Sequence, residues 1–485
     1  MRHSGYLARR TKVICTIGPA SGSAAMIQQL IRAGMNVARL NLSHGTHHEH
    51  SQYINEIKKI SHRLEVNVAI LIDLPGPKYR IGKLKDGQVV LKKGSQVILT
   101  TRQVEGDDTL VPVNISRLPQ DVNVGDSVLL DDGAIKLKVL AKVATEVTCR
   151  VTIGGVLTNG RGLVVPGMRN SGTFITDMLK QHLLFAIKEQ PDYLALSFVR
   201  SAEDITQVKS ILKDNGADIP IIAKIERGVA VNNFDTILTA SDSIMVARGD
   251  LGVDIPLERV PLVQKEIIRK CNQAGKPVIT ATQMLESMVN SYSPTRAEVT
   301  DVANAIFDGT DATMLSAETS IGKYPVQALK TMAKIAREVE SKLPYGQILA
   351  EKGRLFEQRG RLFEQKTEEL ISYNACLTAQ SLGATAIVAF TQSGSTAGRV
   401  SKFRPRVPIL AISPSKVVCG RLVLWWGVYP FQIAGALSVD GLFEIAASLA
   451  KELRLAKSGD LIVVTGGIPI GVAGSTNLLK VERVS

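Results

Sequence analysis

The feature that most constrains the fold of this chain is a regular alternation of short apolar segments with longer amphipathic ones. Eight segments rich in β-branched residues precede residue 320, and a segment with helical periodicity follows nearly every one. Eight alternations of strand and helix predict an α/β protein with a (β/α)8 TIM barrel. The strand candidates are Lys12–Ile17, Asn36–Leu40, Val68–Asp73, Asp192–Ser197, Ile219–Lys224, Ser243–Ala247, Pro277–Ala281 and Ala312–Ser316. The clearest helix candidates are Ala24–Ala33, Glu49–Arg63, Ile205–Asn215, Pro261–Ala274 and Val326–Lys342.

One stretch interrupts this alternation. From about Lys78 to Val165 the helical period disappears, and short alternating segments are separated by turn dipeptides such as Asp132-Gly133. We predict a small all-β domain at 78–165, a β-barrel inserted after the third strand of a barrel that comprises 1–77 and 166–343. Active sites of such barrels lie at the carboxyl ends of the strands, so we interpret the insert as a lid. Its strand candidates are Gln88–Leu91, Gln96–Thr101, Ser127–Leu130, Ile135–Val143 and Glu146–Ile153.

The final part of the chain, 344–485, predicts a C-terminal α/β domain. Apolar segments alternate there with helical ones, of which Leu442–Leu453 is the clearest. A tandem duplication, GRLFEQ-R-GRLFEQ at 353–365, precedes them, and we interpret it as a local duplication on a solvated connecting helix. The strand candidates are Thr385–Phe390, Pro408–Ile412, Asp460–Thr465 and Leu478–Val481.

The composition excludes several classes of protein. A net charge of +13 over 485 residues suggests anionic partners, but aromatic residues make up only 5% and the basic residues are spread along the chain. A nucleic-acid-binding protein needs clustered basic residues with interleaved aromatics, so we expect no nucleic-acid partner. The sequence contains no apolar run of about 18 residues and no signal-peptide core, so we expect no membrane association. The five cysteines are far apart, without a CxxC pair, and we expect reduced thiols in a cytoplasmic protein.

Polar residues gather at the predicted carboxyl ends of six barrel strands. A single polar residue at a strand end is ordinary, but six in register around one ring converge on one mouth. Because the set contains both cations and carboxylates, it predicts a site for Mg²⁺ and an anion. The segments are Arg39–His44, Asp73, Lys224–Arg227, Ala247–Asp250, Thr280–Gln283 and Ser316–Glu318.

The residue types at these ends favour phosphate chemistry. Glu226 and Asp250 are carboxylates on adjacent strand ends, and two carboxylates suit Mg²⁺ or Mn²⁺, which also takes water and substrate oxygens. Lys224 lies two residues before Glu226, so both side chains point to the same side of an extended strand end. A lysine beside a metal fits the stabilisation of charge on a phosphoryl group or an enolate. Arg39 and Arg80 add guanidinium groups that can bind phosphate.

The sequence resembles the pyruvate kinase family. The matching strings cover the predicted barrel almost from end to end, and the order of the predicted domains agrees with the family's. The resemblance implies transfer of a phosphoryl group from phosphoenolpyruvate to ADP, which gives ATP and enolpyruvate that is then protonated at carbon. It also implies a homotetramer. The strings are CTIGPAS (15–21), RLNLSHG (39–45), IDLPGPKYRIG (72–82), AKIERG (223–228), SIMVARGDLGVDIP (243–256), ATQMLESM (281–288), PTRAEVTDVANAIFDGTDATMLSAET (294–319) and KYP (323–325).

The resemblance also implies roles for individual residues. Lys224 matches the lysine that stabilises the transferring phosphoryl group, and Thr282 matches a threonine near the carbon that is protonated. Glu226 and Asp250 match the Mg²⁺ ligands. The implied substrate-binding residues are Arg39, Lys224, Gly249, Asp250 and Thr282. The implied nucleotide-binding residues are Asn41, His44, Arg80 and, more loosely, Arg161.

One departure from the family pattern concerns K⁺. Many members hold K⁺ with residues that match Asn41, Ser43, Asp73 and the carbonyl of the next residue, here Leu74. Those members usually carry Thr after the Asp and Glu five residues after it, whereas this chain has Leu74 and Lys78. That pair resembles the branch in which the lysine ammonium takes over the charge of the cation. We therefore expect that K⁺ is not required; the alternative is a solvated lysine in the lid hinge.

A loop in the last domain carries the pattern of a phosphate site. Thr391–Thr396 lies between a predicted strand and helix, and its hydroxyl residues and glycine suit a phosphate at a helix N-terminus. The same residues also occur as ordinary helix caps. In the family this loop often binds the phosphate of an allosteric effector, so the resemblance implies a sugar-phosphate or nucleotide activator. Its expected contacts are Thr391, Ser393, Ser395 and Thr396.

Two other functions stay open on the residues alone. Another Mg²⁺-dependent, enolate-stabilising barrel of aldolase or lyase type would use the same carboxylates. It would not need the insert, the last domain or the combination of Lys224 with Arg39. A family member without activity that acts as a scaffold would not need the complete set of site residues, and the set is complete here.

Overall fold

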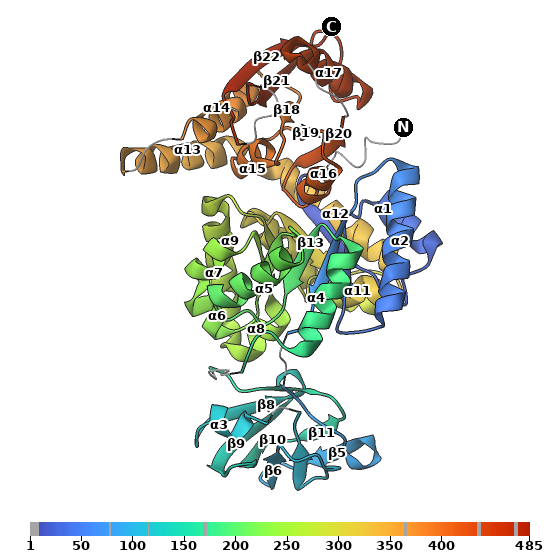
Figure 1. Ribbon diagram of the computed structural model, residues 1–485, viewed down its shortest axis with the longest axis vertical. Coiled ribbons are helices and arrows are strands. Elements are labelled where there is room, and N and C mark those ends of the chain that lie inside the picture. The colour runs from blue at the N-terminus through green and yellow to red at the C-terminus, as the bar shows by residue number, and fades with distance from the viewer. Residues whose placement is uncertain are drawn as a thin grey trace. The chain divides into compact units, whose positions relative to one another are not determined.

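Eight strands form the closed parallel barrel that the alternation predicts, so the fold class is confirmed (Figure 1). The computed structural model describes residues 9–76, 79–114, 116–167, 172–362, 366–433, 438–469 and 474–485. The strand order around the barrel is β1-β17-β16-β15-β14-β13-β3-β2. Each observed strand agrees with its predicted range to within two residues. The strands are β1 (Lys12–Thr16), β2 (Val37–Asn41), β3 (Ala69–Leu74), β13 (Tyr193–Leu196), β14 (Ile221–Ile225), β15 (Ser243–Ala247), β16 (Val278–Ala281) and β17 (Ala312–Leu315).

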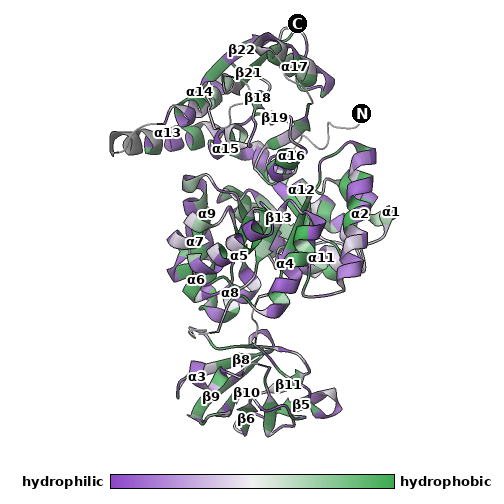
Figure 2. Cartoon of the chain, in the orientation of Figure 1, coloured by the Kyte–Doolittle hydropathy of each residue, from purple (hydrophilic) through white to green (hydrophobic). Residues whose placement is uncertain are grey.

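Helices follow the barrel strands, and their sequences specify where they begin and end. Thr46 and Thr295 form capping boxes with Glu49 and Glu298 at the starts of α2 and α10. Gly34 ends α1 in the left-handed conformation, with φ of 107°. Hydrophilic and hydrophobic residues alternate along these helices (Figure 2), as expected for helices with one buried face. The helices are α1 (Ala24–Ala33), α2 (His47–Leu64), α4 (Asp177–Glu189), α5 (Ala202–Asp214), α6 (Gly228–Asn232), α7 (Phe234–Ala240), α8 (Arg248–Asp254), α9 (Val260–Ala274), α10 (Arg296–Phe307), α11 (Ala317–Ser320) and α12 (Pro325–Lys342), with 3-10 turns η3 (Leu257–Arg259) and η4 (Glu286–Val289).

The inserted stretch is all-β, as expected, with a hydrophobic core of its own. Its strands form a seven-stranded sheet, in the order β4-β12-β8-β9-β10-β6-β7, and a two-stranded sheet of β11 and β5. The five predicted strands are present, but four others, of two to four residues each, were not expected because they are too short to show alternation. The elements are β4 (Tyr79–Arg80), η1 (Lys85–Gly87), β5 (Gln88–Leu91), β6 (Gln96–Thr100), β7 (Leu110–Pro112), α3 (Leu118–Asp121), β8 (Ser127–Leu130), η2 (Asp131–Gly133), β9 (Ile135–Lys142), β10 (Glu146–Ile153), β11 (Gly155–Thr158) and β12 (Gly162–Val164).

The C-terminal region contains a five-stranded sheet in the order β20-β19-β18-β21-β22, with hydrophobic clusters on both faces. Strand β20 was not predicted, because Pro430 interrupts its apolar sequence. It lies at the edge of the sheet and, among the described strands, pairs only with β19; an edge is where a strand tolerates a proline. The first copy of the GRLFEQ duplication lies on helix α13, as expected, while residues 363–365 lie outside the described residues. The elements are α13 (Tyr345–Leu362), α14 (Thr367–Ser381), β18 (Ile387–Phe390), α15 (Ser395–Lys402), β19 (Ile409–Ser413), α16 (Lys416–Leu422), β20 (Val428–Gln432), α17 (Val439–Glu452), β21 (Leu461–Gly466) and β22 (Leu478–Arg483).

The chain divides into two compact units. The first unit comprises Met1–Asp73, Lys188–Leu194 and Ile268–Ser485, and the second comprises Leu74–Ile187 and Ala195–Ile267. The domain limits expected from the sequence, 1–77 with 166–343, 78–165 and 344–485, stay predictions. None of the described helices is long and apolar enough to cross a membrane. All five cysteines belong to the described residues and are free and buried.

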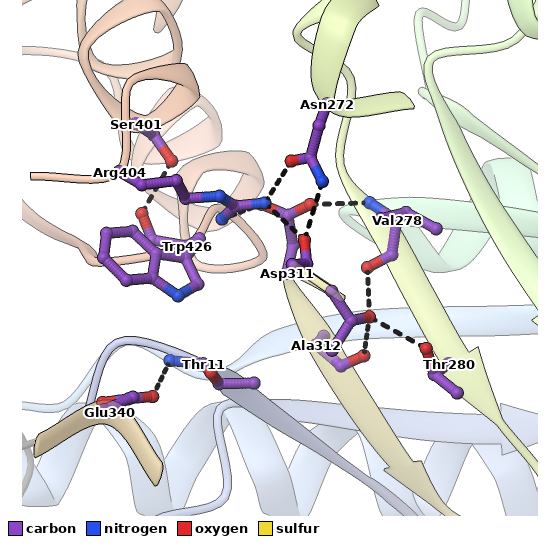
Figure 3. Close-up of polar contacts among 12 residues, drawn as sticks. Thr11, Asn272, Val278, Thr280, Asp311, Ala312, Glu340, Ser401, Arg404 and Trp426 are labelled. Atoms are coloured by element: carbon purple, nitrogen blue, oxygen red, sulfur yellow. Dashed lines mark hydrogen bonds and ion pairs between the residues drawn. The ribbon is translucent and has the colours of Figure 1, made fainter. Parts of the chain in front are cut away.

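Within the first unit, a buried ion pair joins the C-terminal sheet region to the start of two barrel strands (Figure 3). Arg404 Nη1 donates to Asp311 Oδ1 at 2.7 Å, and Arg404 Nη2 donates to Asn272 Oδ1 at 2.6 Å. The second carboxylate oxygen of Asp311 accepts from the backbone N–H of Val278 at 2.9 Å. The Trp426 ring lies beside the guanidinium, 5.1 Å from Arg404 Cζ to the ring centroid. Arg404 is 6% exposed and Asp311 4%, so each charge depends on its partners in the protein rather than on water.

A second buried cation, Lys12 on β1, makes a contact of the same kind in this unit. Its ammonium donates to the carbonyl of Val428 at 2.6 Å and lies 4.0 Å from the centroid of the Tyr429 ring. Burial lowers the pKa of Lys12 well below its usual value. The face of the Tyr429 ring and the Val428 carbonyl both stabilise the protonated form of Lys12 against this effect of burial.

Candidate active site

In the first unit, Arg39 on β2 has a guanidinium fixed by the neighbouring strands. Its Nε and Nη2 both lie 2.8 Å from Asp73 Oδ2, and its Nη1 donates to Thr16 Oγ1 at 2.9 Å. Arg39 and Asp73 are both buried. Three N–H groups held by β1 and β3 leave the side chain in a single orientation, which prepares it to receive an anion.

The residues after β2 form a short turn before α2. Asn41 Oδ1 accepts from the N–H of Ser43 at 3.2 Å, and the His44 carbonyl accepts from His50 Nε2 at 2.8 Å. The side chains of Ser43 and His44 are exposed, while His50 is buried, and burial lowers its pKa. The turn is therefore tied down by backbone contacts and presents the His44 ring to solvent.

The segment after β16 contains strained backbone. Thr282 and Gln283 have φ of +66° and +54°, a left-handed region that costs about 1–3 kcal/mol for a residue other than glycine. Glu318 holds this segment in place, because its Oε1 accepts from the N–H of Leu285 at 3.1 Å and its Oε2 accepts from the N–H of Ser316 at 2.7 Å. Burial raises the pKa of Glu318. Strain maintained by a buried carboxyl group is typical of functional segments, and Thr282 lies within it.

In the second unit, Lys224 and Glu226 form a buried ion pair at the end of β14. Lys224 Nζ lies 2.9 Å from Glu226 Oε1 and donates to Ser197 Oγ at 2.7 Å. Glu226 Oε2 accepts from the N–H of Phe198 at 2.6 Å. Glu226 is 1% exposed and Lys224 7%, so their attraction is weakly screened by water. The two residues that the sequence placed on one side of a strand end do lie in contact.

Ser197 and Phe198 were not predicted as site residues. They follow β13, the fourth barrel strand, whose end carries a single small hydroxyl and no charge. The signal that could have identified them is their position: they follow the carboxyl end of β13, just as the charged site residues follow the carboxyl ends of the other strands. Phe198 also has a φ of +58°, which a sequence does not reveal.

Asp250 lies in α8, and it lines a pocket together with Glu226. Asp254, on the same short helix, accepts from the N–H of Gly228 at 2.6 Å and pairs with Arg227 at 3.4 Å, which fixes α8 against the segment after β14. The lining residues of the pocket are Tyr79, Leu163, Val164, Phe198, Glu226, Arg227, Asp250 and Asp254. Glu226, whose carboxylate contacts the Lys224 ammonium, and Asp250 therefore line the same pocket.

The donor set of this pocket fits a hard divalent cation. Within the described residues, no group of three or more His, Cys, Asp or Glu side chains is placed to hold a metal. A metal at Glu226 and Asp250 would thus have two carboxylate ligands and would complete its shell with water or ligand oxygens. Mg²⁺ and Mn²⁺ accept that arrangement, whereas a structural zinc site needs four protein ligands.

Arg80, on β4, and Arg161, directly before β12, lie close together in the inserted region. Arg80, on β4, pairs with Gly162 of β12, and the N–H of Ile81 donates to the carbonyl of Arg161 at 2.8 Å. Arg80 Nη1 donates to the Gly160 carbonyl at 2.9 Å. Arg161 Nη1 lies 3.1 Å from Asp131 Oδ1, and both arginine side chains are exposed. The structure thus brings together two arginines that are far apart in sequence, on a surface open to an anion.

The predicted cation-site residues are only partly described. The side chain of Leu74 is fully buried, and its carbonyl accepts from the N–H of Ser197 at 3.3 Å. Lys78 lies outside the described residues.

In the first unit, the loop Thr391–Thr396 joins β18 to α15 and is ordered by its own hydroxyls. Thr391 Oγ1 accepts from the N–H of Gly394 at 2.9 Å, and Ser393 Oγ donates to Ser395 Oγ at 3.1 Å. Thr396 Oγ1 lies 2.8 Å from Thr476 Oγ1. Gly394 has a φ of +89°, a conformation that lets the chain turn sharply into α15. Ser393 and Ser395 lie at the start of a helix, and no side chain caps that helix.

Comparisons with known proteins agree along nearly the whole chain. The family model described as "Pyruvate kinase, barrel domain" matches residues 8–329, and the one described as "Pyruvate kinase, alpha/beta domain" matches residues 369–482. A pyruvate kinase of Staphylococcus epidermidis is 45% identical over 478 residues, which cover 98% of this chain and 80% of that protein. A pyruvate kinase of Staphylococcus haemolyticus is 46% identical over 479 residues, with the same coverage. The crystal structure of a pyruvate kinase from Cryptosporidium parvum has a TM-score of 0.93 at 35% identity and covers 99% of this chain and 97% of its own.

Proposed function

Because the chain belongs to the pyruvate kinase family of phosphotransferases, we propose that it transfers the phosphoryl group of phosphoenolpyruvate to ADP, giving pyruvate and ATP, the last step of glycolysis. The observation that carries the proposal is the buried Lys224–Glu226 pair beside the pocket that Glu226 shares with Asp250. This arrangement supplies a fixed cation and two carboxylates at the positions that match the family's substrate and metal ligands.

The proposed chemistry depends on charge and position more than on covalent help. A transferring phosphoryl group spreads negative charge over its oxygens, and fixed cations stabilise that charge without reorganisation. Arg39 and Lys224 would contact these oxygens, and each is held by buried hydrogen-bond partners. The backbone at Gly249 and Asp250 would bind the substrate carboxylate, because α8 begins there and a helix N-terminus favours an anion.

The family implies a requirement for a divalent metal, and Glu226 and Asp250 are the residues that would hold Mg²⁺ or Mn²⁺. When bound, the metal would supply positive charge that stabilises the negative charge of the substrate. Thr282 would lie near the carbon that receives the proton, and the strained backbone around it is consistent with a residue held for that purpose. Closure of the inserted region would exclude water, which otherwise competes with ADP as the phosphoryl acceptor.

The nucleotide phosphates would bind to Asn41, His44, Arg80 and Arg161. The exposed side chains of Arg80, on β4, and Arg161, directly before the paired strand β12, support this assignment because two adjacent arginines suit a diphosphate. We also propose a homotetramer and a cytoplasmic location, as family membership implies; the five free, buried cysteines suit a reducing compartment.

A coupled assay tests the proposed function. Phosphoenolpyruvate, ADP and Mg²⁺ are supplied, and pyruvate formation is followed through oxidation of NADH by lactate dehydrogenase. We expect NADH oxidation that depends on all three components and on the protein. Absence of oxidation above background would reject the proposal and return the aldolase or lyase alternative to consideration.

We further propose that K⁺ is not required, on the basis of Leu74 and Lys78. We expect the same kcat with about 100 mM KCl as with a salt of a large organic cation at equal ionic strength, because an ammonium already supplies the charge. The matched variant combines Leu74→Thr with Lys78→Glu and should become activated by K⁺. Strong activation of the wild type by K⁺ would contradict the proposal.

We propose that the loop Thr391–Thr396 binds the phosphate of a sugar-phosphate or nucleotide activator. The hydroxyls of Ser393 and Ser395 at the start of α15 support this, because they and the helix N–H groups can donate to phosphate. Ser395→Asp is expected to abolish activation, because the new carboxylate repels the phosphate. The measurement is enzyme activity as a function of phosphoenolpyruvate concentration, with and without each of a panel of sugar phosphates and AMP. Ser438→Asp, at the exposed start of α17, adds the same charge elsewhere in the region and should preserve activation. If Ser395→Asp leaves activation by every effector unchanged, the loop has only a structural role.

A further inference from the structure

We propose that Ser197 is a positioning residue for phosphoryl transfer, whose hydroxyl holds the ammonium of Lys224 in its working orientation. The inference rests on the proposed function, in which Lys224 stabilises the transferring group. It concerns a residue that carries no charge and that the sequence pattern of the barrel mouth does not single out.

The hydroxyl gives the Lys224 ammonium a second anchor. A lysine ammonium is a point charge at the end of a flexible four-carbon stem, so one partner does not fix its position. Glu226 Oε1, at 2.9 Å, is a partner from the same strand end, whereas Ser197 Oγ, at 2.7 Å, comes from the end of a different strand. Ser197 is 6% exposed, which shields this hydrogen bond from solvent. Because the hydroxyl is neutral, it orients the ammonium without neutralising the charge, as a second carboxylate would.

The backbone around Ser197 is held rigidly, so its hydroxyl cannot drift. Phe198 has a φ of +58°, which is unfavourable for a residue with a bulky side chain, and its N–H donates to Glu226 Oε2 at 2.6 Å. On the other side, the N–H of Ser197 donates to the Leu74 carbonyl at 3.3 Å. A Cβ atom at Gly76 would lie 2.4 Å from the carbonyl oxygen of Ser197, so this segment packs against the serine as closely as its backbone allows. One strained turn therefore orients both members of the Lys224–Glu226 pair.

This arrangement predicts a particular kinetic signature. In the proposal Ser197 touches neither substrate, so removal of its hydroxyl should leave the binding of phosphoenolpyruvate and ADP nearly unchanged. The ammonium would lose orientation, and its interaction with the transferring group is strongest in the transition state. The loss should therefore fall on kcat rather than on KM.

The test is a double-mutant cycle of Ser197→Ala with Lys224→Met in the full chain. We expect Ser197→Ala alone to lower kcat by about 10- to 100-fold, since small misplacements of catalytic groups cost up to about 10²-fold. Both KM values should stay within about threefold. On the Lys224→Met background, Ser197→Ala should change kcat by less than about twofold, because the hydroxyl acts through the ammonium. Ser241→Ala, which removes a buried serine hydroxyl before β15 in the same unit, is the control and should keep wild-type kcat.

Three results would overturn the inference while the wild type is active. They are an unchanged kcat in Ser197→Ala, a loss of the same factor on the Lys224→Met background, and a loss confined to KM. If Ser197→Ala does not fold, Ser197→Cys keeps the size of the side chain with a weaker hydrogen-bonding group. It should also lower kcat, and a wild-type kcat in Ser197→Cys would equally overturn the inference. A wild type without phosphoryl transfer would instead reject the proposed function.

Discussion

Replacing Lys224 by methionine is expected to lower kcat of phosphoryl transfer by about 10³-fold or more, because a single fixed cation on a transferring phosphoryl group is worth about 10³–10⁵-fold. Methionine keeps much of the length of the side chain and removes the charge. The effect should be larger than that of Ser197→Ala, because Lys224 carries the charge itself and is buried and fixed by two partners, Glu226 and Ser197. The measurement is kcat for pyruvate formation at saturating phosphoenolpyruvate and ADP.

A matched control comes from Lys209, which lies in the same unit and pairs with Asp242 at 3.0 Å while both side chains are about 40% exposed. Lys209→Met removes an exposed pair, which contributes about 0–1 kcal/mol, and should leave kcat unchanged. Because Lys224→Met leaves the Glu226 carboxylate without its cation, thermal unfolding should be recorded for both variants. A folded Lys224→Met protein that retains a tenth or more of wild-type kcat would contradict the assigned role.

The second large effect is on stability. Arg404→Met is expected to lower the free energy of unfolding by about 3–5 kcal/mol, because it leaves the buried Asp311 carboxylate without its cation. The Asn272 side chain and the Trp426 face would lose the guanidinium as well. Since the chain divides into two compact units, which can unfold separately, the midpoint temperature of the first unfolding transition is the appropriate measurement.

Two variants make this prediction specific. Arg404→Met combined with Asp311→Asn removes both charges and should recover part of the lost stability, because an amide is less costly to bury than an unpaired carboxylate. Arg483→Met removes an exposed arginine that donates to the Gly459 carbonyl at 2.9 Å, and it should change stability by no more than about 0.5 kcal/mol. Equal midpoint temperatures for Arg404→Met and the wild type would show that the contacts of Arg404 make no net contribution to stability.

The sequence predicted the barrel well because its strands are apolar, separated by periodic helices and bounded by turns. The strand β20 was missed because Pro430 is compatible with an edge strand, and the edge is defined only once the sheet has formed. The shortest strands of the insert, such as β4 with two residues, carry no periodicity at all. Such strands are specified by pairing with distant strands rather than by their own sequence.

The same distinction holds for the site. Lys224 and Glu226 could be predicted to meet, because two residues along a strand place their side chains on the same side. The contacts of Ser197 and Phe198 could not be predicted, because they span 27 and 28 residues and depend on a left-handed backbone that a phenylalanine rarely adopts. The pairing of Arg404 with Asp311, which are 93 residues apart, is likewise a product of packing.

Pro430 has a consequence for whether a foreign strand can pair with the edge of the C-terminal sheet. The outer edge of a sheet normally offers a row of N–H and carbonyl groups onto which a foreign strand can dock. At the middle of β20 the proline supplies no N–H, and its carbonyl already accepts from Asn67 Nδ2 at 2.7 Å. The two groups that an incoming strand would need at that point are absent or occupied. Pro430, which prevented the prediction of β20 from the sequence, therefore also protects the C-terminal sheet from edge-to-edge aggregation.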